Sequence, residues 1–237
     1  MQLFYNKDIT STDTQFTFDK TESRHIVKVL RKKENDLLQI TNGKNELFTV
    51  KIILANDKRC LVEIVKSETK PKPWNYHLHI AIAPTKNNDR LEWFLEKTTE
   101  IGIDEITPII CSNSERTILK TERLNKIVQS AMKQSLKFVI PKLNEPIKFS
   151  QFINQDFTSD LYIAHCEELD KKSFAKTIEA NTNILILIGP EGDFTPAEIE
   201  KALANKFIPV TLGENRLRTE TAGVAAAQTV ALINELS

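Results

Sequence analysis

Short runs of apolar and β-branched residues alternate with turn-forming residues over the first 70 positions of the chain. Two turn signals, Asn42-Gly43 and Asn56-Asp57, separate these runs, and one helical pattern, Glu22–Leu30, precedes them. The predicted strands are Leu37–Thr41, Glu46–Leu54 and Arg59–Val65. Short strands divided by such turns are typical of antiparallel sheets. This region is therefore predicted to form a small antiparallel β-barrel.

The pattern changes after Ser67–Pro73, a segment with two prolines and three charged residues. Proline favours extended chain, so this segment is predicted to be a linker. Beyond it, apolar runs of strand length alternate with amphipathic helical patterns such as Asp89–Gly102. The predicted strands are Leu78–Ala83, Ile106–Ile110, Leu161–Ala164, Ile184–Ile188 and Ile208–Leu212. The run Ile184–Ile188 lacks polar alternation, as expected for a parallel strand that helices cover on both faces.

These patterns predict two domains, residues 1–70 and residues 71–237, of which the second is α/β. A chain of 237 residues with 41% hydrophobic residues can bury a sizeable core. No apolar run approaches the roughly 18–20 residues that a membrane helix needs. The first ten residues lack the basic and apolar stretches of a secretory signal, so none is expected.

The formal net charge is zero, because 32 Lys and Arg residues balance 32 Asp and Glu residues. Zero charge alone argues against a polyanion-binding protein, since Lys and Arg make most phosphate contacts. The charges are unevenly spread, however. Residues 20–33 hold six basic residues and one acidic residue, and residues 116–142 hold seven and one. Acidic residues gather elsewhere, at Asp156, Asp160, Glu167, Glu168 and Asp170.

The second basic stretch is predicted to be largely helical. At about 100° per residue, Leu124, Val128 and Ala131 fall on one side of the helix. The basic residues cluster roughly opposite, and they are Arg123, Lys126, Lys133 and Lys137. Two interpretations stay open at this point: a solvated helix face, or a track for a phosphate backbone.

Several classes of chemistry are disfavoured by what the sequence lacks. Cys60, Cys111 and Cys166 are odd in number and widely spaced, which excludes a disulfide framework and a C-x-x-C metal knuckle. A reducing cytoplasm is therefore the expected compartment. The four histidines form no zinc pattern, so no metal is expected. The nucleotide-binding motifs G-x-G-x-x-G and G-x-x-x-x-G-K-[ST] and the hydrolase motif G-x-S-x-G are also missing.

Two glycine-containing loops are the candidates for chemistry. The first, Ile188–Glu198, leaves a buried strand and enters a helix whose start carries the capping pattern Thr195-Pro196 with Glu198. The second, Leu212–Ala222, leaves the next strand and brings Arg216, Arg218 and Glu220 to the same edge of the sheet. Ligands of open α/β sheets bind at the carboxyl ends of strands. The plain alternatives are a simple turn for the first loop, and a surface loop with an ion pair for the second.

At these loops the chain resembles the small-subunit ribosomal RNA methyltransferase E family of the knotted SPOUT methyltransferases. The strongest matching residues are Ile188-Gly-Pro-Glu-Gly192, Leu212-Gly213 and Leu217-Arg-Thr-Glu-Thr-Ala222. Supporting matches are His25, Val29-Leu-Arg31, Lys97-Thr-Thr-Glu-Ile-Gly102, Ile106-Thr-Pro108, Glu122-Arg-Leu124, Gln134-Ser135 and Pro141. Two loops in the right order, with matches from end to end, are far more specific than one G-P-E-G.

The resemblance implies an N-terminal PUA-like β-barrel that helps to hold RNA and a C-terminal α/β domain with a parallel sheet and a trefoil knot. It also implies homodimerisation, the cofactor S-adenosyl-L-methionine, and methylation of uracil N3 in 16S ribosomal RNA. The implied cofactor-binding residues are Ile188, Gly189, Gly192, Leu212, Gly213, Leu217 and Thr219. The candidate RNA-binding residues are Arg24, His25, Arg31, Arg123, Lys126, Lys133 and Lys137.

The chain departs from the family pattern in three places. Asp193 stands where the family usually has a second glycine, which bears on the path of the loop. Lys137 stands where an arginine is usual, and it keeps the charge but not the planar fork. The residues around Phe4 include no arginine, so one RNA contact of the family is not expected here.

The acceptor implies the catalytic roles. Neutral uracil carries a proton on N3, so the site must accept that proton or stabilise the uracil anion. Arg218 is the candidate for the anion. Glu191 and Glu220 are candidates to accept the N3 proton or to position the reacting groups. The alternative is that they only accept hydrogen bonds from backbone N–H groups within their loops. Two other functions stay open: a related methyltransferase acting on another ribosomal or transfer RNA position, and a non-catalytic RNA-binding or ribosome-assembly factor.

Overall fold

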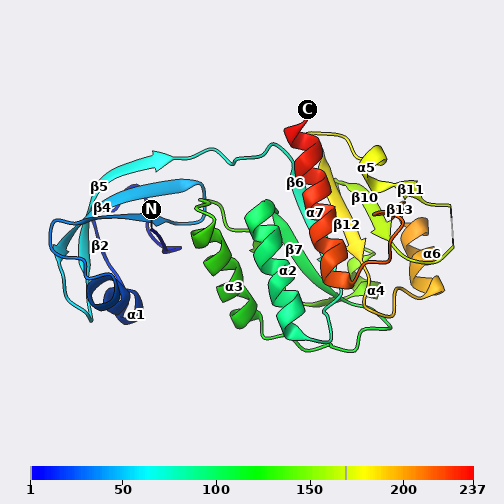
Figure 1. Ribbon diagram of the computed structural model, residues 1–237, viewed down its shortest axis with the longest axis horizontal. Helices are drawn as coiled ribbons and strands as arrows, with labels where there is room; N and C mark the ends of the chain where they lie inside the picture. Colours follow the sequence, from blue (N-terminus) through cyan, green and yellow to red (C-terminus); the bar gives the residue numbers. More distant parts are fainter. Residues whose placement is uncertain (1, 169) are drawn as a thin grey trace. The chain divides into compact units, whose positions relative to one another are not determined.

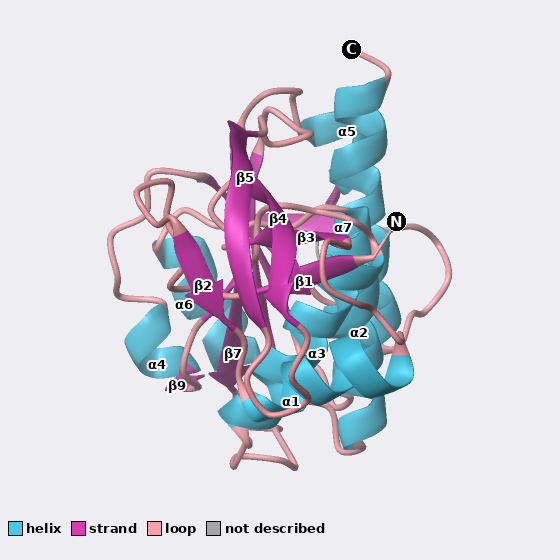
Figure 2. Cartoon of the chain, turned by 90° about the vertical axis from the view of Figure 1, so that its left-hand side faces the viewer, coloured by secondary structure: helices cyan, strands magenta, loops and turns pink. Residues whose placement is uncertain are grey.

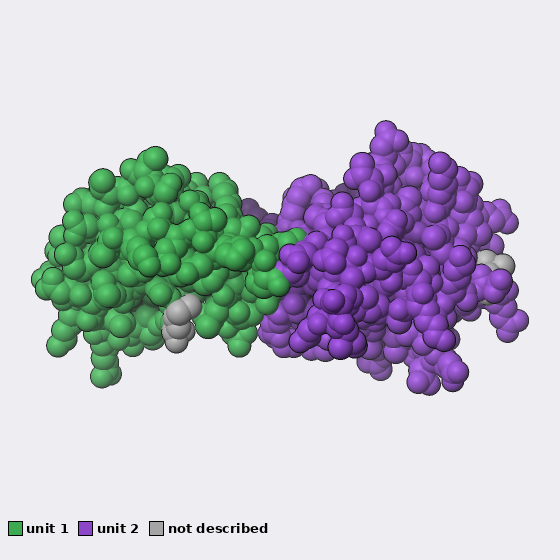
Figure 3. All heavy atoms as spheres, turned by 90° about the horizontal axis from the view of Figure 1, so that it is seen from above, with its two compact units in different colours: residues 1–73, 132–140 green, residues 74–131, 141–237 purple. Residues whose placement is uncertain are grey.

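The computed structural model describes residues 2–168 and 170–237, which form two compact units (Figure 3). One unit comprises residues 1–73 and 132–140, and the other comprises residues 74–131 and 141–237. Backbone contacts attach the segment 132–140 to the first unit. The N–H of Asn45 donates to the carbonyl of Phe138 at 2.8 Å, and Lys44 forms an isolated bridge with Val139.

The first unit is built on one curved five-stranded sheet (Figure 2). Its strands are β1 (Leu3–Tyr5), β2 (Gln15–Thr17), β3 (Leu37–Thr41), β4 (Glu46–Leu54) and β5 (Leu61–Thr69), in the order β1-β3-β4-β5-β2. The three predicted strands are confirmed as β3, β4 and β5. Strand β5 ends at Thr69, however, so the first residues of the segment predicted to be a linker, Ser67–Thr69, are strand because they pair with β4. The pairing is antiparallel except between β1 and β3, which run parallel. Side chains such as Ile40, Phe48 and Val62 are fully buried beneath the sheet.

The helix predicted at Glu22–Leu30 is two elements. An α-helix, α1 (Lys20–Arg24), begins where the side chain of Asp19 accepts the N–H of Glu22 at 2.8 Å. It then widens into a π-helix, η1 (His25–Val29), shown by the N–H of Leu30 donating to the carbonyl of His25. A π turn is one residue wider than an α turn. Here it buries Ile26 completely while Val29 stays 67% exposed.

The second unit holds an all-parallel sheet, as the apolar runs predict. Its strands are β6 (His77–Ile82), β7 (Glu105–Ile110), β8 (Lys142–Leu143), β10 (Asp160–Ala164), β11 (Lys172–Ser173), β12 (Asn183–Ile188) and β13 (Ile208–Thr211), with the short β9 (Ile147–Lys148) beside β7. The order is β11-β13-β10-β12-β6-β7-β8. Strand β10 thus lies between β12 and β13, and the loops that follow these three strands leave the sheet at one edge.

Helices cover both faces of this sheet. They are α2 (Asn88–Ile101), α3 (Thr121–Gln134), α4 (Phe149–Phe152), α5 (Phe174–Thr177), α6 (Pro196–Ala204) and α7 (Thr219–Glu235). Figure 1 shows α2 and α7 side by side over β6 and β12. On the other face, Phe152 of α4 and Ile199 of α6 join one buried cluster with Ala81 and Leu185. Every helix of the described residues is too short or too polar to cross a bilayer.

A buried histidine on β6 gives the second unit a pH-dependent stability. His79 is 8% exposed, and burial lowers its pKa to about 4. Its Nε2 lies 2.7 Å from the hydroxyl of Thr107, which also accepts from the amide of Asn144 at 2.7 Å. The hydroxyl proton is therefore available to Nε2, which suits a neutral imidazole.

We expect this histidine to destabilise the fold in acid. Between pH 6.5 and about 4 the unfolded chain binds a proton that folded His79 does not, so stability falls as pH falls through this window. The loss is on the order of 3 kcal/mol. Urea unfolding of the wild type and of His79→Gln at pH 7 and pH 4.5 measures it. The wild type should lose more stability than the variant, and equal losses would contradict the assignment.

Candidate functional site

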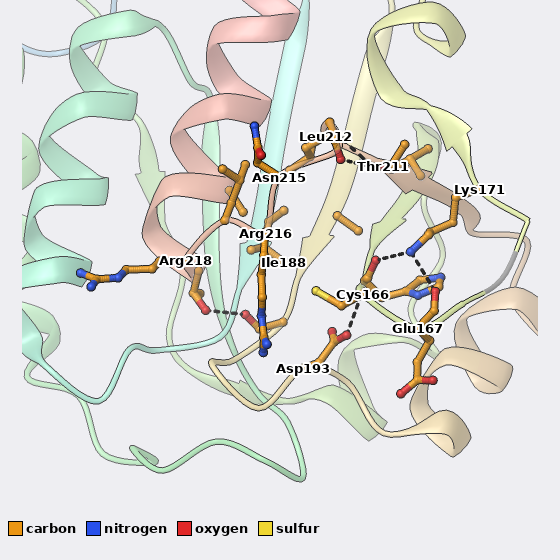
Figure 4. A pocket seen from close by; sticks show the side chains of 18 of the residues that line it. Cys166, Glu167, Lys171, Ile188, Asp193, Thr211, Leu212, Asn215, Arg216 and Arg218 are labelled. Atoms are coloured by element: carbon orange, nitrogen blue, oxygen red, sulfur yellow. Dashed lines mark hydrogen bonds between the residues drawn. The ribbon is translucent and has the colours of Figure 1, made fainter.

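A cavity of about 840 Å³ lies at the carboxyl ends of β10, β12 and β13 (Figure 4). Three segments line it. They are residues 164–168 with Lys171, residues 188–193, and residues 210–219 with Ala222, as far as these residues are described. The two predicted glycine-containing loops therefore do meet at one site, together with a third segment that follows β10.

The first loop is held firmly at its exit into α6. The predicted capping box is present, because the N–H of Thr195 donates to Glu198 Oε2 at 2.9 Å and the Thr195 hydroxyl accepts the N–H of Glu198 at 3.3 Å. The other carboxylate oxygen, Oε1, accepts the N–H of Ser112 at 2.8 Å. Glu198 thus connects the start of α6 to the segment that follows β7.

Asp193, the residue that departs from the family pattern, makes side-chain hydrogen bonds that a glycine could not make. Its φ is 63°, in the left-handed region that glycine favours and that aspartate tolerates better than most residues. Its side chain accepts the N–H of Cys166 at 2.6 Å and that of Phe194 at 2.8 Å. The substitution therefore adds a connection between the loop after β12 and the loop after β10.

The second loop approaches the first through backbone and hydroxyl groups. The hydroxyl of Thr219 donates to the carbonyl of Gly189 at 3.0 Å. Gly213 has φ 143°, which side-chain-bearing residues rarely adopt. A Cβ on Gly189 would stand 3.0 Å from the buried ring of Phe194. All seven residues predicted for the cofactor line the cavity, namely Ile188, Gly189, Gly192, Leu212, Gly213, Leu217 and Thr219.

The three catalytic candidates are placed differently. Arg218 and Glu191 line the cavity, and Glu220 does not. Glu191 Oε1 accepts the backbone N–H of Lys86 at 3.0 Å, so it does bond to a backbone group, but in the β6–α2 turn and not within its own loop. Glu220 is 6% exposed, and its Oε1 lies 3.8 Å from Arg90 Nε on α2. Figure 4 shows Arg218 directed away from Cys166, Asp193 and Lys171, which gather on the other side of the cavity.

Acidic residues neutralise some of the predicted RNA-binding cations. Arg123 meets the carboxylate of Glu92 twice, at 2.6 Å and 3.0 Å. Lys133 lies 3.3 Å from Glu22, which also stands 3.7 Å from His25. Arg24, Arg31 and Lys126 are exposed, and Lys137 is half-buried beyond the end of α3. The predicted basic face of α3 is therefore partly cancelled by acidic residues.

Sequence reasoning missed the third wall of the cavity. His165 is 7% exposed, and neither ring nitrogen has a hydrogen-bond partner among the described residues. Burial and the nearby Lys171 lower the pKa of His165, which favours the neutral imidazole. Lys171 Nζ donates to the carbonyls of His165 and Glu167 at 3.0 Å and 2.8 Å. The sequence does contain a signal for this wall, because His165 directly follows the predicted strand Leu161–Ala164, which corresponds to β10.

The described residues offer no candidate site for a metal ion. Within the described part of the chain, His, Cys, Asp and Glu form no group of three or more that could hold one. The lining instead mixes glycine backbone, apolar side chains such as Ile188, Leu212 and Leu217, and carboxylates such as Glu167 and Asp193. Such a lining suits an organic ligand with both apolar and polar parts.

Comparisons with known proteins agree with this architecture. A family model described as RNA methyltransferase domain matches residues 72–231, and one described as RNA methyltransferase PUA domain matches residues 18–65. Ribosomal RNA small subunit methyltransferase E of Buchnera aphidicola is 33% identical over 90% of this chain and 86% of its own length. The protein of the same name from Bacillus subtilis is 29% identical over 93% of this chain and 91% of its own length.

Solved structures extend the agreement to the whole fold. A probable rRNA-methyltransferase from Porphyromonas gingivalis superposes with a TM-score of 0.93 and 41% identity, covering 100% of this chain and 99% of that chain. Ribosomal RNA small subunit methyltransferase E from Neisseria gonorrhoeae, bound to S-adenosyl methionine, superposes with a TM-score of 0.83 and 27% identity. That match covers 96% of this chain and 95% of the other. The predicted fold class, an α/β methyltransferase domain with a small PUA-like β-domain, is confirmed. The chain belongs to the ribosomal RNA small subunit methyltransferase E family.

Proposed function

We propose that this chain transfers a methyl group from S-adenosyl-L-methionine to N3 of a specific uridine in 16S ribosomal RNA. The observation that carries the proposal is the cavity in which two family-type glycine loops meet at the edge of a parallel sheet. A second support is the name of the relatives, which are small-subunit ribosomal RNA methyltransferases over nearly the whole chain.

The cavity fits the cofactor by size and by chemistry. Its volume, about 840 Å³, lies in the range of small-molecule sites. Apolar side chains, among them Ile188 and Leu217, suit an adenine ring, and Glu167 and Glu214 suit ribose hydroxyls or an ammonium group. His165 contributes buried ring nitrogens that have no partner among the described residues. When bound, the cofactor supplies an electrophilic methyl group on a sulfonium.

The residues of the chain then have to make N3 nucleophilic. We assign Arg218 to the negative charge that loss of the N3 proton places on the uracil oxygens, because it lines the cavity and has no acidic partner within the described residues. Glu191 holds the turn at Lys86 in place. Glu220 fixes Arg90 behind the cavity wall. Both carboxylates are positioning residues, and the proton passes to solvent water. The acceptor base must leave any stack or pair, since N3 is on its Watson–Crick edge.

The proposal also covers the roles of the two domains, the oligomeric state and the cellular compartment. Residues 1–70 act as an RNA-holding domain and residues 71–237 as the catalytic domain. Two chains form a homodimer, which light scattering after size-exclusion chromatography would detect. A ribosomal RNA substrate places the protein in the cytoplasm. No metal takes part in the transfer, so chelators are expected to leave it unchanged.

Mapping of N3-methyluridine by mass spectrometry in ribosomal RNA from a strain lacking the gene tests the proposed reaction. We expect one N3-methyluridine of 16S RNA to be lost in that strain and restored by the purified protein with the cofactor. Loss of a different methylated nucleotide, or of one in transfer RNA, would identify the alternative methyltransferase. Calorimetry that detects no cofactor binding would favour the non-catalytic RNA-binding factor.

A further inference from the structure

The arginines of the second unit differ in whether an acidic residue neutralises them. Arg123 is bidentate on Glu92, and Arg90 faces Glu220. A guanidinium paired in this way has little attraction left for a phosphate. Arg116, which lies in the segment between β7 and α3, has no carboxylate within salt-bridge distance among the described residues.

Arg116 is nevertheless held in place. Its Nη2 donates to the carbonyl of Lys86 at 2.7 Å, and its Nε lies within hydrogen-bond distance of the carbonyls of Thr85 and Lys86, at 3.3 Å and 3.2 Å. Carbonyl oxygens orient a guanidinium without cancelling its charge. The nearest acidic neighbour in sequence, Glu115, is taken by the ammonium of Lys86 at 2.8 Å. The side chain of Arg116 is thus an ordered and uncompensated cation.

The position of Arg116 relates it to the cavity through two sets of contacts. Lys86, whose carbonyl it binds, donates its N–H to Glu191 of the cavity lining at 3.0 Å. Three residues before it, Asn113 donates to the carbonyls of Gly192 and Asp193 at 3.1 Å and 3.0 Å. The segment that carries Arg116 therefore borders the lining loop on the side of the β6–α2 turn.

We propose that Arg116 binds a phosphate of the acceptor RNA strand next to the nucleotide whose base enters the cavity, an inference that rests on the proposed function. A base turned into a pocket brings its own flanking phosphates to the rim. An immobilised guanidinium with Nη1 unoccupied within the described residues fits a phosphate oxygen there. Phosphate contacts of this kind set the register of the strand without reading its sequence.

The test measures binding of an unmodified full-length 16S RNA transcript by filter retention at several salt concentrations. Arg116→Gln removes the charge but keeps an amide donor for the carbonyls of the turn, and Arg116→Lys keeps the charge. We expect Arg116→Gln to weaken RNA binding about tenfold and to flatten the slope of log affinity against log salt by about 0.7–0.9. Arg116→Lys should keep the slope of the wild type.

The matched control is Lys201→Gln. The ammonium of Lys201 also donates to a backbone carbonyl, that of Ser150 at 3.3 Å, but the residue lies on α6 outside the cavity lining. Its substitution should leave the salt slope unchanged. An unchanged slope in Arg116→Gln would overturn the proposal. So would a raised dissociation constant for the cofactor in both Arg116 variants, since that indicates a role confined to holding the turn.

Calorimetry with the cofactor and methyl transfer by the wild type, measured in the same series, keep two failures apart. If the wild type binds the cofactor and methylates the transcript while Arg116→Gln retains its salt slope, only the phosphate site is wrong. If the wild type neither binds the cofactor nor methylates RNA, the proposed function itself is wrong, and the phosphate site falls with it.

Discussion

Arg218→Ala is expected to lower the rate of methyl transfer by about 10²- to 10³-fold, the usual effect of removing one group that stabilises developing negative charge. The fold should survive. Arg218 is exposed, and it caps α7 through its backbone alone, with its carbonyl accepting the N–H of Ala222 at 2.8 Å. Cofactor affinity should stay near that of the wild type, since the side chain is directed away from the wall formed by Asp193 and Lys171 (Figure 4).

Single-turnover transfer of a labelled methyl group, with calorimetry on the same preparations, measures both expectations. Arg216→Ala is the matched control, because it removes an identical charge from the same exposed loop two positions earlier. It should retain much more activity than Arg218→Ala. Raising the pH should recover part of the loss in Arg218→Ala, since a more basic solution removes the N3 proton without help. Equal losses of transfer rate in the two variants would show that the loop needs only its positive charge, and that no specific role belongs to Arg218.

The sequence predicts the strands of both units well because their burial is strongly patterned. The run Ile184–Ile188 is buried throughout in β12, as a parallel strand between helix layers must be. The capping pattern at Thr195 is equally local, since all its hydrogen bonds join residues three apart. Loops at the carboxyl ends of such strands are gathered by the sheet itself, so the cavity could be placed from the strands and the two motifs.

What escaped prediction depends on contacts between distant residues or on very short elements. Strands β1 and β2 have three residues each, too few to show a period. The π-helix after Arg24 differs from an α-helix only in its hydrogen bonds. Arg123 is neutralised by Glu92, which lies 31 positions earlier in the chain. Arg116 donates to the carbonyl of Lys86 in the β6–α2 turn, 30 positions earlier. No periodicity encodes such pairs, so the basic stretch 116–142 looked more uniform than it is.

Gly223→Ala is expected to destabilise the protein by about 2 kcal/mol or more, although alanine is the better helix former by about 1 kcal/mol. A Cβ at this position in α7 would overlap Cε2 of Phe94, and it would stand 2.7 Å from Cδ2 of the same ring and 3.1 Å from Cδ1 of Ile82. Phe94 of α2 is fully buried, so its ring cannot swing into solvent. Overpacking of this kind costs about 1–3 kcal/mol and occasionally more, which outweighs the gain in helix propensity.

Urea unfolding of Gly223→Ala measures this loss, with Gln228→Ala as the control on the exposed side of the same helix, where a change within about 0.5 kcal/mol is expected. Phe94→Leu should relieve the clash, so the double variant should be more stable than the sum of the single effects predicts. A Gly223→Ala protein as stable as the wild type would show that α2 and α7 can separate at little cost.

The close packing matters for the site, because the first residues of α7, from Thr219 to Ala222, include part of the cavity wall. A helix pushed away from Phe94 would carry Thr219 away from the Gly189 carbonyl, so Gly223→Ala should also weaken cofactor binding.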